Sequence, residues 1–278
     1  MSPPHDTSAR RIHAVLAAAM ADPALLERWR RRPAALNKAG IGAAAFELDK
    51  IWRFAGLVTK VRHNDLRISL PLTFKLLDLG HLSIEAFANY AKQAAALRRS
   101  GRKSKAERMQ SLFEFLDGWL DRRNPAHAAV WDMIRHERAL LELQADAPSA
   151  QAEGANGRQV CAETIPVRGE RVIRHEMSFN PVALVRMLRA GTYALATLPR
   201  GPFLVAYCRD QRASRIDILE IDEVTSVLLD LADGSRSIGE IAALLRGAGI
   251  PVEIDNLCGM VRELIAGGLI VQDNLSGA

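Results

Sequence analysis

Residues 219–245 have the sequence LEIDEVTSVLLDLADGSRSIGEIAALL, which predicts a strand followed by two helices. The first helix should end at an Asp-Gly pair, and Ser235 or Ser237 should begin the second. A third, amphipathic helix is expected from about Asp255 to Ala266, followed by a short apolar strand at Leu269–Val271. A strand, three helices and a strand in so short a span are typical of a small winged helix-turn-helix.

The charge of this region bears on what it binds. Residues 203–278 contain six arginines, no lysine and twelve Asp or Glu residues, a net charge of −6, whereas the whole chain carries +5. A helix that reads DNA needs basic surroundings, because contacts to phosphates supply most of the affinity. The predicted helix Asp255–Ala266 has one arginine, Arg262, beside Asp255 and Glu263. The charge therefore argues against DNA and in favour of a peptide.

Two segments carry a resemblance to a known family. Residues 229–241 (LDLADGSRSIGEI) and 264–270 (LIAGGLI) resemble the peptide-recognition modules of the PqqD type, which bind leader peptides in pathways that modify ribosomally made peptides. The resemblance places such a module at about residues 201–273. In that family the leader adds as an extra strand to the strand before the first helix and lies against the third helix. Backbone hydrogen bonds then supply affinity, and pockets for alternate side chains supply selectivity.

Carried over to this chain, the resemblance makes residues 215–221 the receiving strand. Alternation places Ile216 and Ile218, with Glu220, on one face of that strand. The implied peptide-binding residues are those of the strand and four apolar residues of the third helix: Arg215, Ile216, Asp217, Ile218, Leu219, Glu220, Ile221, Leu257, Met260, Val261 and Leu264. Alternatively, the apolar residues only pack the core of the three helices, which is the ordinary role of such a stripe.

A narrower resemblance covers about 100 residues on the C-terminal side. The segments 179–191 (FNPVALVRMLRAG) and 203–210 (FLVAYCRD) look like those of partner proteins that accompany multinuclear non-haem iron oxidases, as in the methanobactin and 3-thiaglutamate systems. The resemblance implies that the iron belongs to a separate oxidase chain with a barrel fold. This chain would hold no cofactor, would form a heterodimer with the oxidase, and would deliver a cysteine-bearing precursor peptide.

The remaining sequence predicts an α+β protein of two parts. Residues 146–158 hold no aromatic and no β-branched residue, so we interpret them as a linker between a helical domain (1–145) and a strand-containing region (159–278). The expected helices of the first part are Arg10–Met20, Ala24–Arg32, Phe46–Val58, Phe74–Leu79, Ser83–Arg98, Ala106–Asp121 and Pro125–Gln144, with an extended piece at Leu66–Leu70. The second part is expected to form strands at Gln159–Ile165, Glu170–Phe179, Phe203–Cys208 and Arg215–Ile221. The first two of these strands could form a hairpin. Asn180-Pro181 is expected to start a helix at Val182–Arg189.

The N-terminal half is basic, with 24 Lys or Arg against 16 Asp or Glu in residues 1–150. Its two concentrations of charge predict an electrostatic dock for an acidic enzyme surface or an acidic stretch of the precursor. The candidate docking residues are Arg28, Arg31, Arg32, Arg98, Arg99, Arg102, Lys103 and Lys105. Two alternatives stay open: a solvated helix face with a flexible charged loop, or nucleic-acid binding that uses Trp29 among the arginines.

No motif in the chain predicts catalysis or a metal site. His127 and His136 fall on opposite faces of one predicted helix, and there is no phosphate-binding glycine loop and no Gly-x-Ser-x-Gly. The histidines are therefore expected to be isolated and hydrogen-bonded. Three scattered cysteines indicate buried thiols in a reducing compartment. With no apolar run of 18 residues and no signal peptide in the pattern, we expect no membrane association and a cytoplasmic location.

These inferences predict a non-catalytic partner protein that binds the leader of a ribosomal precursor and presents it to an iron-dependent oxidase. The first alternative is a winged-helix transcriptional regulator, in which only the basic half could hold DNA. The second alternative is an enzyme that acts alone. Nucleic acid is not the expected partner, because the predicted reading helix is acidic.

Overall fold

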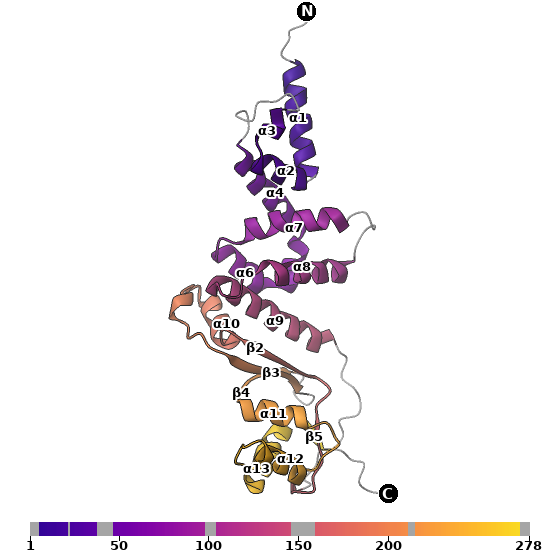
Figure 1. The fold of residues 1–278 in the computed structure, drawn as a ribbon, viewed down its shortest axis with the longest axis vertical. Coiled ribbons are helices and arrows are strands. Elements are labelled where there is room, and N and C mark those ends of the chain that lie inside the picture. The colour runs from indigo at the N-terminus through magenta and orange to yellow at the C-terminus, as the bar shows by residue number, and fades with distance from the viewer. Residues whose placement is uncertain are drawn as a thin grey trace, which may run out of the picture. The chain divides into compact units, whose positions relative to one another are not determined.

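The computed structural model describes residues 6–21, 23–37, 47–97, 104–145, 159–210 and 215–272 (Figure 1). The chain divides into two compact units, an N-terminal unit (Met1–Ile134) and a C-terminal unit (Arg135–Ala278). The division falls inside helix α9 (Pro125–Ala145), whereas the sequence placed the boundary after that helix. The reason is that Ala139 and Leu143, in the second half of α9, are buried in a core cluster of the C-terminal unit. The predicted linker, 146–158, lies outside the described residues.

Helices are the only regular elements among the described residues of the N-terminal unit. Its helices are α1 (Asp6–Ala21), α2 (Pro23–Arg31), α3 (Ala34–Asn37), α4 (Leu48–Arg62), α5 (Asn64–Ser69), α6 (Pro71–Leu79), α7 (Ser83–Leu97), α8 (Lys105–Trp119) and the first part of α9. The extended piece expected at Leu66–Leu70 is wrong, because this segment is the end of α5 and its C-cap. Leu66 and Leu70 are both fully buried, and their spacing of four residues puts them on the same side of a helix.

Helix α4 packs against two other helices of this unit. Trp52 and Ala55 lie in a buried cluster with Trp29 of α2. On the side that faces α7, Gly56 allows the two helices to approach closely, because a Cβ atom there would overlap the backbone oxygen of Ile84. The position of α4 is therefore fixed by contacts with two other helices.

The C-terminal unit is built on a three-stranded antiparallel sheet with the order β2 (Val172–Met177), β3 (Phe203–Asp210), β4 (Arg215–Ile221). Its other elements are α10 (Pro181–Ala190), a short 3-10 turn (Leu195–Thr197), α11 (Glu223–Leu231), α12 (Ile238–Gly247), α13 (Ile254–Ala266), and the strands β1 (Pro166–Arg168) and β5 (Ile270–Gln272). Three antiparallel strands followed by three helices match the order expected from the sequence, and the fold is α+β.

The first part of this unit differs from the prediction. Residues 159–165 are not a strand, because their carbonyl groups accept hydrogen bonds from the first turn of α12: Ile238 N to Thr164 O at 2.9 Å and Gly239 N to Ala162 O at 2.8 Å. The expected hairpin is also wrong, since β1 pairs with β5 and not with β2. Contacts with segments far away in the sequence therefore decide the conformation here.

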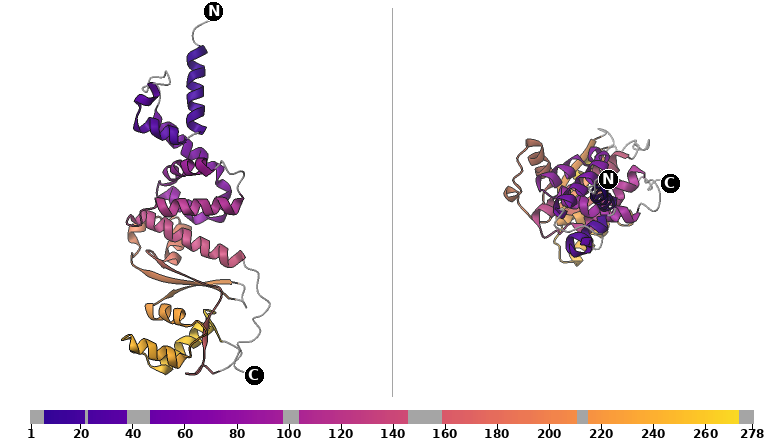
Figure 2. Two further views of the ribbon diagram at one scale, coloured as in Figure 1. Left: turned by 45° about the vertical axis from the view of Figure 1, so that its right-hand side comes forward. Right: turned by 90° about the horizontal axis from the view of Figure 1, so that it is seen from above.

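Helices lie on both faces of the three-stranded sheet (Figure 1; Figure 2). On one face, Ile216 and Ile218 of β4 pack with Tyr207 and with residues from the second half of α9. On the other face, Leu219 and Ile221 pack against the core formed by α11, α12 and α13. The alternation predicted for β4 is confirmed.

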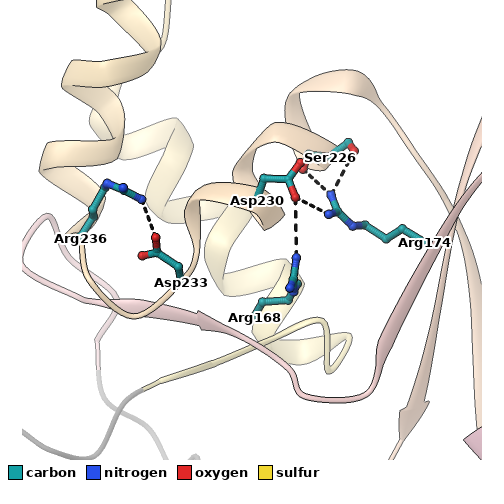
Figure 3. Close-up of polar contacts among 6 residues, drawn as sticks. All are labelled: Arg168, Arg174, Ser226, Asp230, Asp233 and Arg236. Carbon is teal, nitrogen blue, oxygen red and sulfur yellow. Dashed lines mark hydrogen bonds and ion pairs between the residues drawn. The ribbon is translucent and has the colours of Figure 1, made fainter.

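Arginine side chains attach α11 to strands other than β4 (Figure 3). Arg174 of β2 donates to the carbonyl oxygen of Ser226 at 2.8 Å and pairs with the carboxylate of Asp230. Arg168 of β1 lies 3.7 Å from the same carboxylate. The hydrogen bond from Arg174 holds the pKa of Asp230 below its usual value. Arg174 thus anchors α11 to the edge of the sheet opposite β4, and Arg168 adds a contact from the separate β1–β5 pair.

The turn between α11 and α12 is fixed by local polar contacts. Asp233 pairs with Arg236 at 2.7 Å, and Gly234 adopts a φ of 80°. Ser237 accepts a hydrogen bond from the backbone N–H of Glu240, and the Glu240 side chain accepts one from the backbone of Ser237. This reciprocal capping begins α12. Of the two serines that the sequence offered, Ser237 is the N-cap.

Candidate functional site

Strand β4 forms an outer edge of its sheet. All seven of its residues pair with β3, from Ile221 opposite Leu204 to Arg215 opposite Asp210. No other segment within the described ranges pairs with β4. Because an edge strand presents a row of unpaired N–H and C=O groups, it can accept hydrogen bonds from, and donate them to, a further strand.

Helix α13 flanks this edge on one face of the sheet. Its C-cap, Gly267, lies beside β4, since a Cβ atom there would be 3.8 Å from Cδ1 of Leu219. The same end of the helix is tied to the neighbouring strand, where the thiol of Cys208 contacts the carbonyl oxygen of Gly267 at 3.2 Å. Met260 and Leu264 are partly buried and pack at the margin of the same core as Leu219. Both side chains are therefore partly exposed.

The other two helix residues named from the sequence have a different role. Leu257 and Val261 are both 0 % exposed and lie inside the core of the three helices. A bound peptide would not reach them without opening that core. For these two residues the alternative interpretation, core packing, describes the structure, whereas Met260 and Leu264 are only partly buried.

A pocket of about 370 Å³ flanks β4 on the opposite face of the sheet. The residues that line it come from the start of α10, from β3 and from β4: Asn180, Pro181, Val182, Ala183, Arg186, Val205, Ile218 and Glu220. Asn180 caps α10 by accepting hydrogen bonds from two backbone N–H groups, and its Nδ2 donates to Oε2 of Glu220 at 2.6 Å. The sequence indicated this helix start at Asn180 but not its place beside the receiving strand.

Charge is unevenly distributed along β4. Glu220, Asp222 and Glu223 at the end of the strand are all exposed. Hydrogen bonds from Thr225 lower the pKa of Asp222, so that carboxylate stays ionised. At the start of the strand, Arg215 already pairs with Asp217 of the same chain at 2.9 Å. The edge is therefore acidic where β4 ends, and its one basic residue is neutralised locally.

The predicted docking residues are only partly described. Arg28, Arg31 and Arg32 are exposed, and Arg31 pairs with Glu27 at 2.9 Å, as on an ordinary solvated helix face. Trp29 is only 7 % exposed and packs in the core, so it has no face free for stacking on a base. Lys105 is exposed at the first position of α8. The other candidates, Arg98, Arg99, Arg102 and Lys103, lie outside the described residues.

A buried polar cluster lies under the second half of α9. Nδ1 of His136 is 3.1 Å from Oη of Tyr207, and Nδ1 of His175 is 3.0 Å from Nη2 of Arg135. Both histidine rings pack against the ring of Tyr207. Burial, together with nearby arginines, lowers the pKa of each histidine to about 4. These two histidines are hydrogen-bonded, as expected from the sequence.

This cluster predicts a loss of stability in acid. Below about pH 6.5 the histidines of the unfolded chain take up protons, whereas those of the folded chain stay neutral until about pH 4. For His136, 3 % exposed, the loss across that range is on the order of 3 kcal/mol. Urea unfolding at several pH values between 7 and 4 should show this decline, and His136→Gln should reduce it. An equal pH dependence in the variant would contradict this role of His136.

The cysteines agree only in part with the expected buried thiols. Cys208 and Cys258 are buried, and burial raises the pKa of the Cys258 thiol, but Cys161 is exposed. Within the described ranges, no three His, Cys, Asp or Glu side chains come together in a way that could hold a metal ion. In the same part of the chain, no helix combines the length and the apolar character needed to cross a bilayer.

No protein-family model matches this chain, and comparison with curated proteins finds no match.

Proposed function

We propose that the C-terminal unit binds an extended polypeptide as an additional strand on β4. In this proposal the unit is a winged-helix module of the PqqD type. The chain serves as a non-catalytic partner, which presents a ribosomally made precursor peptide to an iron-dependent oxidase. The observation that carries the proposal is the outer edge of β4, which pairs only with β3 among the described residues. A pocket lies on one face of the sheet beside it, and partly buried apolar residues lie on the other.

The two flanking surfaces fit the alternation of a guest strand. Successive side chains of a strand point to opposite faces of the sheet. One set would meet the apolar margin formed by Leu219, Met260 and Leu264. The other set would meet the pocket beside Ile218 and Glu220. Backbone hydrogen bonds would supply affinity, while these two surfaces would select the side chains.

The charge of the edge favours a basic guest. The three exposed carboxylates Glu220, Asp222 and Glu223 lie where β4 ends, and Arg215 is paired within its own strand. A guest segment with Lys or Arg residues at that end would gain complementary contacts, which favour correct register and partner choice. The exposed face of α13, with Asp255 and Glu263 beside Arg262, gives no comparable support to a DNA phosphate backbone.

Presentation of the guest would act through local concentration. A peptide held on β4 and an oxidase held by the same chain would meet at an effective concentration in the millimolar range for a short connection. The oxidase would supply the iron, and this chain would supply binding and orientation. The basic N-terminal unit, with 22 Lys or Arg against 13 Asp or Glu in residues 1–134, would favour an acidic enzyme surface.

The proposal can be tested with synthetic peptides encoded by short reading frames next to the gene. Titration calorimetry with the full chain should identify a peptide that binds, and a scrambled peptide of the same composition should not. Hydrogen exchange should then slow in Arg215–Ile221 and in Ile254–Ala266 when that peptide is present, because both segments would lose solvent access. Binding that leaves exchange in β4 unchanged would refute strand addition at this edge.

A further inference from the structure

Helix α4 of the N-terminal unit carries an apolar stripe that faces solvent. Phe54, Leu57 and Val61 are 57 %, 44 % and 64 % exposed. Their spacing of three and four residues places them on one face of the helix. Single exposed apolar residues are normal on protein surfaces, but an aligned set of large ones is typical of an interaction site.

Packing inside the unit does not account for this stripe. The side of α4 that packs in the unit is formed by other residues, among them Trp52, Ala55 and Thr59, which are all buried. Gly56 holds the helix close to α7, so the buried side is fixed in place. The stripe is therefore presented on a rigid element and has no described neighbour that covers it.

Arginine residues border the stripe on both sides. At 100° per residue, Arg53 lies about 100° to one side of Phe54, and Arg62 lies about 80° to the other side. Both arginines are exposed, and neither makes an ion pair with any residue in the described ranges. The nearby Lys50 and Lys60 differ, because they pair with Glu47 and Asp78.

We infer that this stripe, Phe54, Leu57 and Val61 with Arg53 and Arg62, docks an acidic partner protein that offers an apolar centre bordered by carboxylates. Apolar centres with polar rims are the usual anatomy of protein interfaces. A second copy of the chain fits poorly, because it would bring the same arginines to the same place. A lipid surface fits poorly as well, since α4 presents only three large apolar residues and its other side is fixed in the unit.

This surface is independent of the edge of β4. It lies in the N-terminal unit and uses none of the residues assigned to peptide binding. It also differs from the arginine clusters that the sequence suggested for docking, because an apolar centre was not part of that prediction. Failure of the peptide proposal would therefore leave this inference intact, and the reverse also holds.

The test uses a designed probe with the chemistry of the expected partner. The probe is a fluorescein-labelled helical peptide with leucines along one face and glutamates beside them, titrated with the full chain and followed by anisotropy. Binding should weaken about tenfold or more in the double variant Phe54→Ser, Leu57→Ser, and also in Arg53→Glu, Arg62→Glu. A matched control is Leu244→Ser, which changes a residue of α12 that is 50 % exposed, and it should keep the affinity of the parent protein.

Other outcomes would overturn the inference. A version of the probe with lysines in place of the glutamates should bind much more weakly, and equal binding would contradict charge complementarity. Vesicles of phosphatidylserine and phosphatidylcholine test whether the stripe binds lipid. If the parent protein binds the vesicles and the Phe54→Ser, Leu57→Ser variant does not, the stripe is a membrane-binding surface. Sedimentation tests self-association. If the parent protein is a dimer and the same variant is a monomer, the stripe is an interface between two copies of the chain. Thermal unfolding of each variant checks that it is folded.

Discussion

Either Asp217 or Ile218 of β4 directs its N–H group to the open edge, and proline at that position is expected to weaken peptide binding strongly while the protein stays folded. In an antiparallel strand, successive residues direct their N–H groups to opposite sides, so one of the two faces β3 and the other faces the open edge. Proline at the outer position removes a donor that only the guest would use, and proline is tolerated on that side of an edge strand. We expect affinity to fall tenfold or more. Proline at the inner position removes a hydrogen bond to β3 and should lower stability.

Calorimetry with a peptide that binds the parent protein, combined with thermal unfolding, separates these two effects. The matched controls are Asp217→Ser and Ile218→Val, which keep both N–H groups and should change affinity much less than proline does. A well-folded proline variant without binding would support strand addition. If both proline variants fold and bind with the affinity of the parent, the guest does not pair with β4.

Gly56→Ala is expected to destabilise the N-terminal unit by about 1–3 kcal/mol. The added Cβ atom would overlap the backbone oxygen of Ile84 and lie 3.1 Å from Cβ of Ala88, so α4 and α7 would have to separate. Backbone atoms within a helix cannot move aside as the end of a flexible side chain can. This steric cost should exceed the gain of about 1 kcal/mol that alanine brings over glycine in a helix interior.

Gly118→Ala in α8 is the matched control for this substitution. Gly118 is also helical and belongs to the same unit, but a Cβ atom there would meet no heavy atom within 4 Å apart from its chain neighbours and the nearby backbone of its own helix. The Gly118→Ala protein should therefore be more stable than the parent protein by up to about 1 kcal/mol. Urea unfolding of both variants measures the difference, and a Gly56→Ala protein as stable as the Gly118→Ala protein would contradict the close approach of α4 to α7.

Local signals in the sequence predicted much of the fold. The alternation along residues 215–221 gave both the strand and the face of each side chain, because it depends only on the two-residue period of a strand. The start of α10 followed from Asn180 and the following proline, and Ser237 was one of two expected caps for α12. These features are set by residues only a few positions apart.

The predictions were wrong where contacts with distant segments decide the local conformation. Residues 159–165 alternate as a strand would, but their carbonyl groups bond to the first turn of α12, more than 70 residues further along the chain. Leu66–Leu70 was expected to be extended, yet burial of Leu66 and Leu70 on one side of α5 favours a helix. Local propensity cannot predict these contacts, because their energy depends on which distant segments pack together.

Residue patterns alone show that β4 is a strand with two different faces, that three helices follow it, and that this part of the chain is acidic. The folded chain was needed to show that β4 lies at an edge and that Asn180 contacts Glu220, 40 residues away. It also shows that Phe54, Leu57 and Val61 face solvent while Trp52 is buried. Periodicity shows which side chains share a face of a helix or strand. Whether that face is buried depends on residues far away in the chain, and periodicity does not reveal them.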